Sequence, residues 1–202
     1  MKQKLLLATN NKNKVREYRS LLKGVPFKLV TMAEEGITTE VDEVGESYKE
    51  NAILKATLLA AESGLIALAD DSGTEIDALG GEPGILSHRY AGEGASDSDR
   101  NIYLLSRMQD VQEGNRSASF HCAIALATPG GEVETCHGEC RGTITFEPRG
   151  EQSFGYDPIF FIPELGKTMA ELSLEEKNSI SHRGHAARKA AELLKKPPFS
   201  IL

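Results

Sequence analysis

Short apolar runs alternate with helical spacings of apolar residues over most of the chain. The run KLLLAT at 4–9 predicts a short strand. From about Asn13 to Gly24 the apolar side chains are spaced as on one face of a helix: Val15, Tyr18, Leu21 and Leu22. The run LIALA at 65–69 is apolar throughout, which is typical of a strand covered on both faces.

Capping residues mark further helix boundaries. Ser47 and Glu50 have the spacing of a capping box, which predicts a helix to about Ser63 that Gly64 ends. The second half repeats these signals: a capped helix at 96–108, strands over 117–147 broken at 129–131, a capping box at Ser173 and Glu176, and a final helix before Pro197. This order predicts an α/β fold with a mixed central β-sheet flanked by helices.

Length and charge narrow the class of protein. The 202 residues, of which 40 % are hydrophobic and 26 % charged, predict one globular domain over 1–202 with two lobes. The 23 Lys plus Arg stand against 30 Asp plus Glu, a net charge of −7. Nucleic acids and anionic membranes attract positive proteins, so the expected partner is a small molecule.

The chain carries no sign of export. No run reaches the roughly 18 apolar residues of a membrane span, and the apolar core of MKQKLLLATNNKNK is too short for a signal peptide. Three cysteines fit a reducing compartment, so a cytoplasmic location is expected. Cys136 and Cys140 with His121 and His137 could be zinc ligands, but they fall in expected strands without paired Cys-x-x-Cys spacing.

The turn after the first strand has the features of an anion site. Backbone N–H groups at a helix start and amide side chains donate to anions, and Lys14 adds positive charge. No GxxxxGK[ST] motif occurs, so the turn is not a P-loop, and an asparagine-rich turn with exposed lysines is the alternative. The candidate phosphate ligands are Thr9, Asn10, Asn11, Lys12, Asn13 and Lys14.

Two acidic pairs suggest a metal. Asp42 and Glu43 precede the second helix, and Asp70 and Asp71 follow the apolar run, where ligands bind in open α/β sheets. Like charges about 4 Å apart repel by roughly 1 to 4 kcal/mol, so such a cluster needs cations. Magnesium is favoured over Lys55 alone because it takes carboxylates and phosphate oxygens. A simple polar turn is the alternative.

Asn51 and Lys55 are four residues apart and therefore lie on one face of the expected helix. Taken alone, this pair indicates a solvated stripe. If their face looks into the same cleft as Lys14, both residues become candidates for binding substrate.

Two later stretches suggest a nucleobase site. Aromatic rings stack on bases, and a carboxylate accepts hydrogen bonds from a base edge. Lys, His and Arg side chains donate to carbonyl or phosphate oxygens. A Ser-His-Asp triad is disfavoured because no G-x-S-x-G elbow occurs, and residues 159–161 read as aromatic core. The candidates are Phe154, Gly155, Tyr156 and Asp157 in SFGYDPIFF, and Lys177, His182 and Arg183 in EKNSISHRG.

These stretches together resemble the non-canonical purine nucleoside triphosphate pyrophosphatase family, also called inosine triphosphatases or XTP/dITP diphosphatases. The likeness runs over nearly the whole chain. In family order it comprises LATNNKNKVREY, GESYKENAILKA, ADDSG, DALGGEPGILSHRYAGE, FGYDPIFF and GKTMAELSLEEKNSISHRG. Six motifs in order are far more specific than any one of them.

The resemblance implies a magnesium-dependent homodimer, bilobed with a cleft, that hydrolyses ITP, dITP and XTP to the monophosphate and pyrophosphate. Asp71 would be the proton acceptor and a metal ligand, supported by Asp70 and by an acid of the Asp42-Glu43 pair. The substrate contacts that it implies are Thr9 to Lys14 and Lys55 for phosphate, Ser72, and Phe154 to Asp157 with Lys177, His182 and Arg183 around the base.

Hypoxanthine and xanthine carry a carbonyl at position 6, where adenine has an amino group. A hydrogen-bond donor in the site would therefore favour hypoxanthine and xanthine over adenine.

The family pattern is broken at four positions: Thr74, Glu75, His88 and Ser153. None of them removes a catalytic candidate. The alternatives are a Maf-type nucleotide pyrophosphatase with another base preference, and a nucleotide-binding sensor without turnover, which the presence of both Asp70 and Asp71 disfavours.

Overall fold

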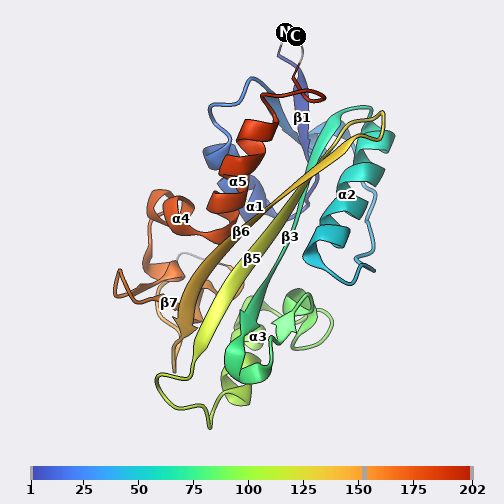
Figure 1. The fold of residues 1–202 in the computed structure, drawn as a ribbon. Coiled ribbons are helices and arrows are strands. Elements are labelled where there is room, and N and C mark those ends of the chain that lie inside the picture. The colour runs from blue at the N-terminus through green and yellow to red at the C-terminus, as the bar shows by residue number, and fades with distance from the viewer. Residues whose placement is uncertain (1, 152–153, 201–202) are drawn as a thin grey trace. The chain divides into compact units, whose positions relative to one another are not determined.

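The computed structural model describes residues 2–151 and 154–200 of the chain (Figure 1). Ser153, one of the departures from the family pattern, lies outside the described residues. The helices are α1 (Lys12–Leu21), α2 (Tyr48–Ser63), α3 (Asp97–Arg107), α4 (Leu174–Ile180) and α5 (His182–Leu193). Within the described ranges, none of these helices is both long enough and apolar enough to cross a membrane.

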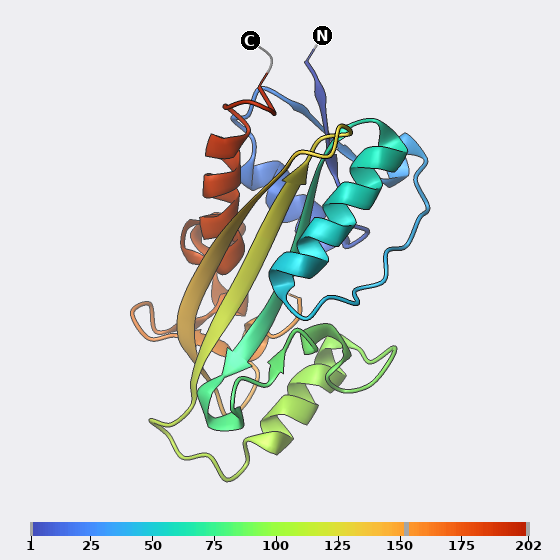
Figure 2. The same ribbon diagram turned by 45° about the vertical axis from the view of Figure 1, so that its right-hand side comes forward.

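The strands pair in both directions. They are β1 (Lys4–Leu7), β2 (Lys28–Thr31), β3 (Ile66–Ile76), β4 (Pro83–Gly84), β5 (Ser117–Ala127), β6 (Val133–Ile144), β7 (Phe160–Ile162) and β8 (Lys167–Thr168). β1 is parallel to β2 and β3, whereas β3 and β5 point in opposite directions (Figure 2). β6, β7 and β8 pair antiparallel in that order. The prediction of a mixed sheet is therefore confirmed.

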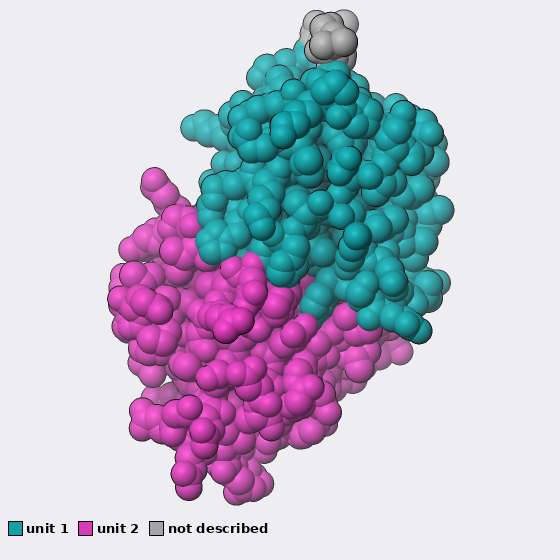
Figure 3. Space-filling view, in the orientation of Figure 1, with its two compact units in different colours: residues 1–71, 122–138, 182–202 teal, residues 72–121, 139–181 magenta. Residues whose placement is uncertain are grey.

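The chain divides into two compact units (Figure 3). Unit 1 comprises Met1–Asp71, Cys122–Gly138 and His182–Leu202, and unit 2 comprises Ser72–His121 and Glu139–Ser181. The strands β3, β5 and β6 contribute residues to both units. The single domain with lobes and a cleft stays a prediction.

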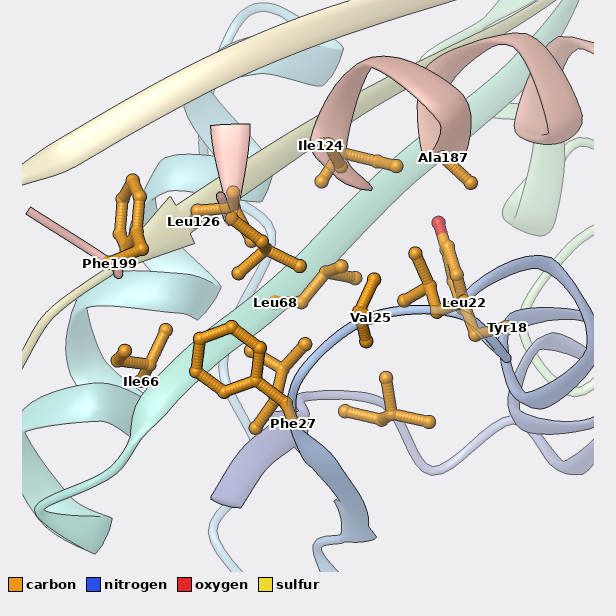
Figure 4. Close-up of a cluster of buried hydrophobic side chains, with 14 of the residues drawn as sticks. Tyr18, Leu22, Val25, Phe27, Ile66, Leu68, Ile124, Leu126, Ala187 and Phe199 are labelled. Atoms are coloured by element: carbon orange, nitrogen blue, oxygen red, sulfur yellow. The ribbon is translucent and has the colours of Figure 1, made fainter. Parts of the chain in front are cut away.

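In unit 1, alternate strand residues face different helices. Leu5, Ile66, Leu68 and Ile124 belong to one core cluster, which includes Tyr18 of α1 and Ala187 of α5 (Figure 4). The opposite face is rich in alanine and packs against α2: Ala67, Ala69, Ala123, Ala125 and Ala127 meet Ala52, Ala56 and Ala60. The prediction that the LIALA strand is covered on both faces is confirmed.

The predicted end of this strand is wrong. β3 does not stop at Asp70 but continues to Ile76, so the alternative of a polar turn at Asp70 is also wrong. β4 pairs with β3 in unit 2, with Thr74 opposite Gly84 and Glu75 opposite Pro83. In unit 1, Leu7 at the end of β1 lies opposite Leu68. The two aspartates therefore lie just past the carboxyl end of β1.

The capping predictions are met to different degrees. Ser173 and Glu176 form the full reciprocal box, and Gly64 ends α2 at φ 67°. Ser47 accepts a hydrogen bond from the Glu50 amide, but the Glu50 carboxylate accepts from the Glu46 amide instead of closing the box. The first helix ends at Leu21, three residues before the predicted glycine.

Candidate functional site

Asp70 and Asp71 point to opposite faces of the sheet. Successive side chains alternate along a strand, so Asp70 shares the face of Leu68 with α1 and α5, and Asp71 shares the face of Ala69 with α2. Asp70 is 2 % exposed and Asp71 is 7 % exposed. The strand pleat turns the two carboxylates to different faces, but the charges of both, with that of Glu43, act on Lys55. The acidic cluster as a metal site stays a prediction.

Asp70 lies among cations. Its Oδ2 is 3.0 Å from Lys14 Nζ and 3.3 Å from Arg183 Nε. Burial raises the pKa of Asp70, but Lys14, Arg183 and Lys55 outweigh burial and hold this pKa below its ordinary value. The carboxylate is therefore ionised and fixes the lysine of the first turn of α1.

Arg183 also pairs with an acid that the sequence reading missed. Its Nη1 donates to Glu17 Oε2 at 2.8 Å, and the two residues are 2 % and 1 % exposed. A signal existed in the helix, since Glu17 lies three residues after Lys14 and four residues before apolar Leu21 and therefore shares a face with both. A charge on that buried face needs a partner.

The turn before α1 is organised by its own side chains. Asn11 Oδ1 accepts from the amides of Asn13 and Lys14 at 2.9 and 3.2 Å, which makes Asn11 the N-cap. Thr9 Oγ1 accepts from the Asn11 amide. The alternative, an asparagine-rich turn with exposed lysines, agrees with the exposed Lys12 but not with Lys14, which is half-buried. Phosphate binding by Thr9 to Lys14 stays a prediction.

Asp71 is held from α2. Asn51 Nδ2 donates to Asp71 Oδ2 at 3.0 Å, and Asn51 Oδ1 accepts from the Gly45 amide at 2.8 Å. Lys55 Nζ donates to Glu43 Oε1 at 2.6 Å and to the Asp70 carbonyl at 2.7 Å, and it lies 3.9 Å from Asp71 Oδ1. Asn51 is 2 % exposed, so the alternative of a solvated stripe is wrong.

Burial and charge adjust the proton affinities of this group. Burial and the charge of Glu43 raise the pKa of Asp71 above its ordinary value, and Lys55 offsets them only in part. Burial lowers the pKa of Lys55, but Asp70, Asp71 and Glu43 outweigh it and raise this pKa. Asp71 is thus a stronger base than an exposed aspartate and stays beside a charged amine.

The acids fit a magnesium ion in donor type. Glu43 and Asp71 both lie at Lys55, whereas Asp42 is exposed. Magnesium accepts a few carboxylates and completes its shell with water and phosphate oxygens. No group of three or more His, Cys, Asp or Glu side chains within 2–151 and 154–200 is placed to hold a metal. Cys136 instead donates to the Ala186 carbonyl.

The predicted base residues are divided between the units. Phe154 to Asp157 and Lys177 belong to unit 2, as does half-buried Ser72. Lys177 forms a buried ion pair with Asp157, and its Nζ lies 4.5 Å from the centre of the Phe154 ring. His182 and Arg183 belong to unit 1. The contacts of all these residues with a base stay predictions.

The remaining aromatic residues follow the predicted core in part. Ile159 and Phe160 are fully buried, and Phe160 stacks on Phe120. Phe161 is half-buried and lies beside the Arg149 guanidinium, so its assignment to the core was wrong. The alternation along β7 explains this difference.

The start of α5 requires a glycine on β6. A Cβ at Gly138 would lie 2.1 Å from the His182 carbonyl oxygen and 2.5 Å from the Ala186 nitrogen. We expect Gly138→Ala to lower the free energy of unfolding by about 1–3 kcal/mol, measured by urea denaturation. Gly24→Ala is the control, because nothing lies within 4 Å of its Cβ. Equal stability of the two variants would contradict the close packing.

By fold, the chain is a mixed α/β protein with a charged site on strand β3 of its sheet. A HAM1 protein of Coxiella burnetii has the same fold, with a TM-score of 0.86, 42 % identity and coverage of 96 % of this chain and 98 % of its own. The Staphylococcus aureus Ham1 protein gives a TM-score of 0.84 at 38 % identity, with coverage of 96 % and 98 %. The Ham1 family model matches residues 5–193, and the chain belongs to the Ham1 family.

Relatives of known name cover nearly the whole chain. A dITP/XTP pyrophosphatase of Desulforamulus reducens is 50 % identical over 191 residues, which is 95 % of each chain. A dITP/XTP pyrophosphatase of Geobacter sulfurreducens is 50 % identical over 183 residues, which is 91 % of this chain and 92 % of the relative. The resemblance found in the sequence is confirmed.

Proposed function

We propose that this protein hydrolyses purine nucleoside triphosphates with deaminated bases, ITP, dITP and XTP, to the monophosphate and pyrophosphate. The observation that carries the proposal is a sequence identity of 50 %, over nearly the full length, to each of two dITP/XTP pyrophosphatases. The surroundings of Asp71 support the proposal. Its carboxylate has a raised pKa, accepts a hydrogen bond from Asn51 and lies beside Lys55.

In the proposed reaction Asp71 takes a proton from the attacking water. The oxygen of that water bonds to the phosphorus of the first phosphate, the anhydride bond between the first and second phosphates breaks, and pyrophosphate leaves. Asn51 donates to Asp71 Oδ2 and thereby fixes the orientation of the Asp71 carboxylate, the general base. Lys55 and Lys14 neutralise phosphate charge, and each is already aligned by an aspartate of β3.

We include magnesium in the proposal, held by Asp71 and Glu43. Bound there, the ion would neutralise phosphate charge and lower the pKa of a bound water. The base would be contacted by Phe154 to Asp157, Lys177, His182 and Arg183, and the hydrogen-bond donors among these residues would favour a carbonyl at position 6 of the base.

We also propose that the protein is a cytoplasmic homodimer. Leu86 and Ile102 have exposed apolar side chains, at 51 % and 62 %, and are the positions to substitute in a test of its interface.

The deciding experiment measures pyrophosphate and free phosphate from ITP, dITP, XTP, GTP and ATP, with magnesium and with EDTA. We expect magnesium-dependent pyrophosphate from the first three, loss of turnover to background in EDTA, and recovery when magnesium is restored. Release of free phosphate would contradict the proposal. Preference for another nucleotide would favour the Maf-type alternative, and binding of ITP without turnover would favour a sensor.

A further inference from the structure

Asn101 is a buried amide in the middle of α3. It is 4 % exposed, and its neighbour one turn on, Leu104, is fully buried in the core of unit 2. Asn101 Nδ2 donates to the Gly155 carbonyl at 3.1 Å. Among the described residues, Asn101 Oδ1 has no hydrogen-bond partner.

A buried amide with one hydrogen bond is unfavourable in a helix that packs on a core. Burial of an unpaired polar atom costs stability, and asparagine is also a poorer helix former than leucine. Neither helix formation nor core packing therefore accounts for Asn101. The contact with Gly155 is what an apolar residue at this position would lose.

Gly155 is the residue of its segment that has no side chain to anchor it. The Phe154 ring lies beside Lys177 Nζ, the Tyr156 hydroxyl donates to the Ser87 carbonyl at 2.8 Å, and Asp157 pairs with Lys177. Gly155 has a φ of 65°, a conformation that most residues avoid. Its carbonyl, held by Asn101, is therefore the backbone anchor between the two aromatic residues.

We propose that Asn101 is a positioning residue for base discrimination, which fixes the backbone of Gly155 and through it the ring of Phe154. This inference rests on the proposed function, in which Phe154 to Asp157 contact the base. Asn101 itself touches no reacting atom. Its effect is expected on the recognition of the base and not on the chemical step.

The test compares Asn101→Leu and Asn101→Asp with wild type. Leucine has the same branching and number of side-chain heavy atoms as asparagine but no donor. Aspartate has the shape of asparagine but, once ionised, cannot donate to the Gly155 carbonyl, so its effect should grow as the pH of the assay rises. We expect each to raise KM for ITP about tenfold and to lower the ITP-to-ATP ratio of kcat/KM about tenfold, which corresponds to one lost hydrogen bond. The kcat for ITP should stay within about threefold, because Asp71 and its contacts remain.

Leu104→Ala is the matched control. It removes buried apolar contacts of the same helix without removing the hydrogen bond to Gly155, so it should lower the unfolding midpoint and leave the ITP-to-ATP ratio unchanged. If Leu104→Ala shifts the ratio as far as Asn101→Leu does, or if neither Asn101 variant changes KM, the inference is wrong.

Hydrogen–deuterium exchange of the peptide 154–162 separates this inference from the proposed function. We expect faster exchange in Asn101→Leu than in wild type, and no such selective change in Leu104→Ala. Wild-type protein without pyrophosphatase activity would end the proposed function, while the exchange result would still decide whether Asn101 fixes the segment. Unchanged exchange in Asn101→Leu would overturn the positioning role.

Discussion

Asp71→Asn is expected to lower kcat for pyrophosphate release from ITP by about 10²- to 10⁴-fold, the range of a lost general base. The substitution keeps the shape of the side chain, and the new amide oxygen can still accept from Asn51 Nδ2. It removes the proton acceptor and one negative charge. Lys14 and Lys55 remain, so ITP should still bind, which calorimetry can measure alongside the rate.

Glu75→Gln is the control for this prediction. Glu75 is another carboxylate of β3, but it belongs to unit 2 and lies 3.5 Å from His121. Its variant should hydrolyse ITP at nearly the wild-type rate. Turnover close to wild type by Asp71→Asn would refute the role of Asp71, and loss of ITP binding would show that the carboxylate acts mainly on the site's structure.

Arg183→Met is expected to lower the free energy of unfolding by about 3–5 kcal/mol at neutral pH, measured by urea denaturation. The arginine is buried between Glu17 and Asp70, so its loss leaves two carboxylates without their shared cation. A second substitution, Glu17→Gln, should recover part of the loss because it removes one of the two negative charges that faced the arginine.

The pH dependence of this effect has a defined sign. The folded-state pKa of Asp70 lies below its ordinary value, so its ion pairs stabilise the wild type above about pH 4 and lose that contribution as the pH falls further. The deficit of Arg183→Met should therefore narrow in acid. Arg141→Met is the control, since Arg141 pairs with Glu139 while 86 % of its side chain is exposed. A similar loss in both variants would contradict the buried network.

Local patterns predicted the parts of the site that depend on one element. Helical spacing placed Asn51 and Lys55 on one face, and both reach the β3 aspartates. The extent of β3 was not local, because its continuation past Asp71 depends on pairing with distant strands, β4 at Pro83 and Gly84 and β5 on its other edge. A strand cut short at Asp70 hides the alternation that separates the two acids.

The buried ion pairs of Arg183 could not be predicted from local patterns for a similar reason. Arg183 and Glu17 are 166 residues apart in the chain, and only the folded unit brings α5 beside α1. Glu75, which had no explanation in the sequence, lies 3.5 Å from His121. The Thr74 backbone amide donates to Ser87 Oγ at 2.8 Å, a contact that any residue except proline can make, so the structure does not explain the threonine.

The alanine layer under α2 sets how near that helix can lie to the sheet. Alanine meets alanine across this interface, so the helix axis approaches β3 more closely than larger side chains would allow. The short contacts of Asn51 and Lys55 with β3 depend on that distance. A larger side chain in this layer would move α2 away from β3 and lengthen both contacts.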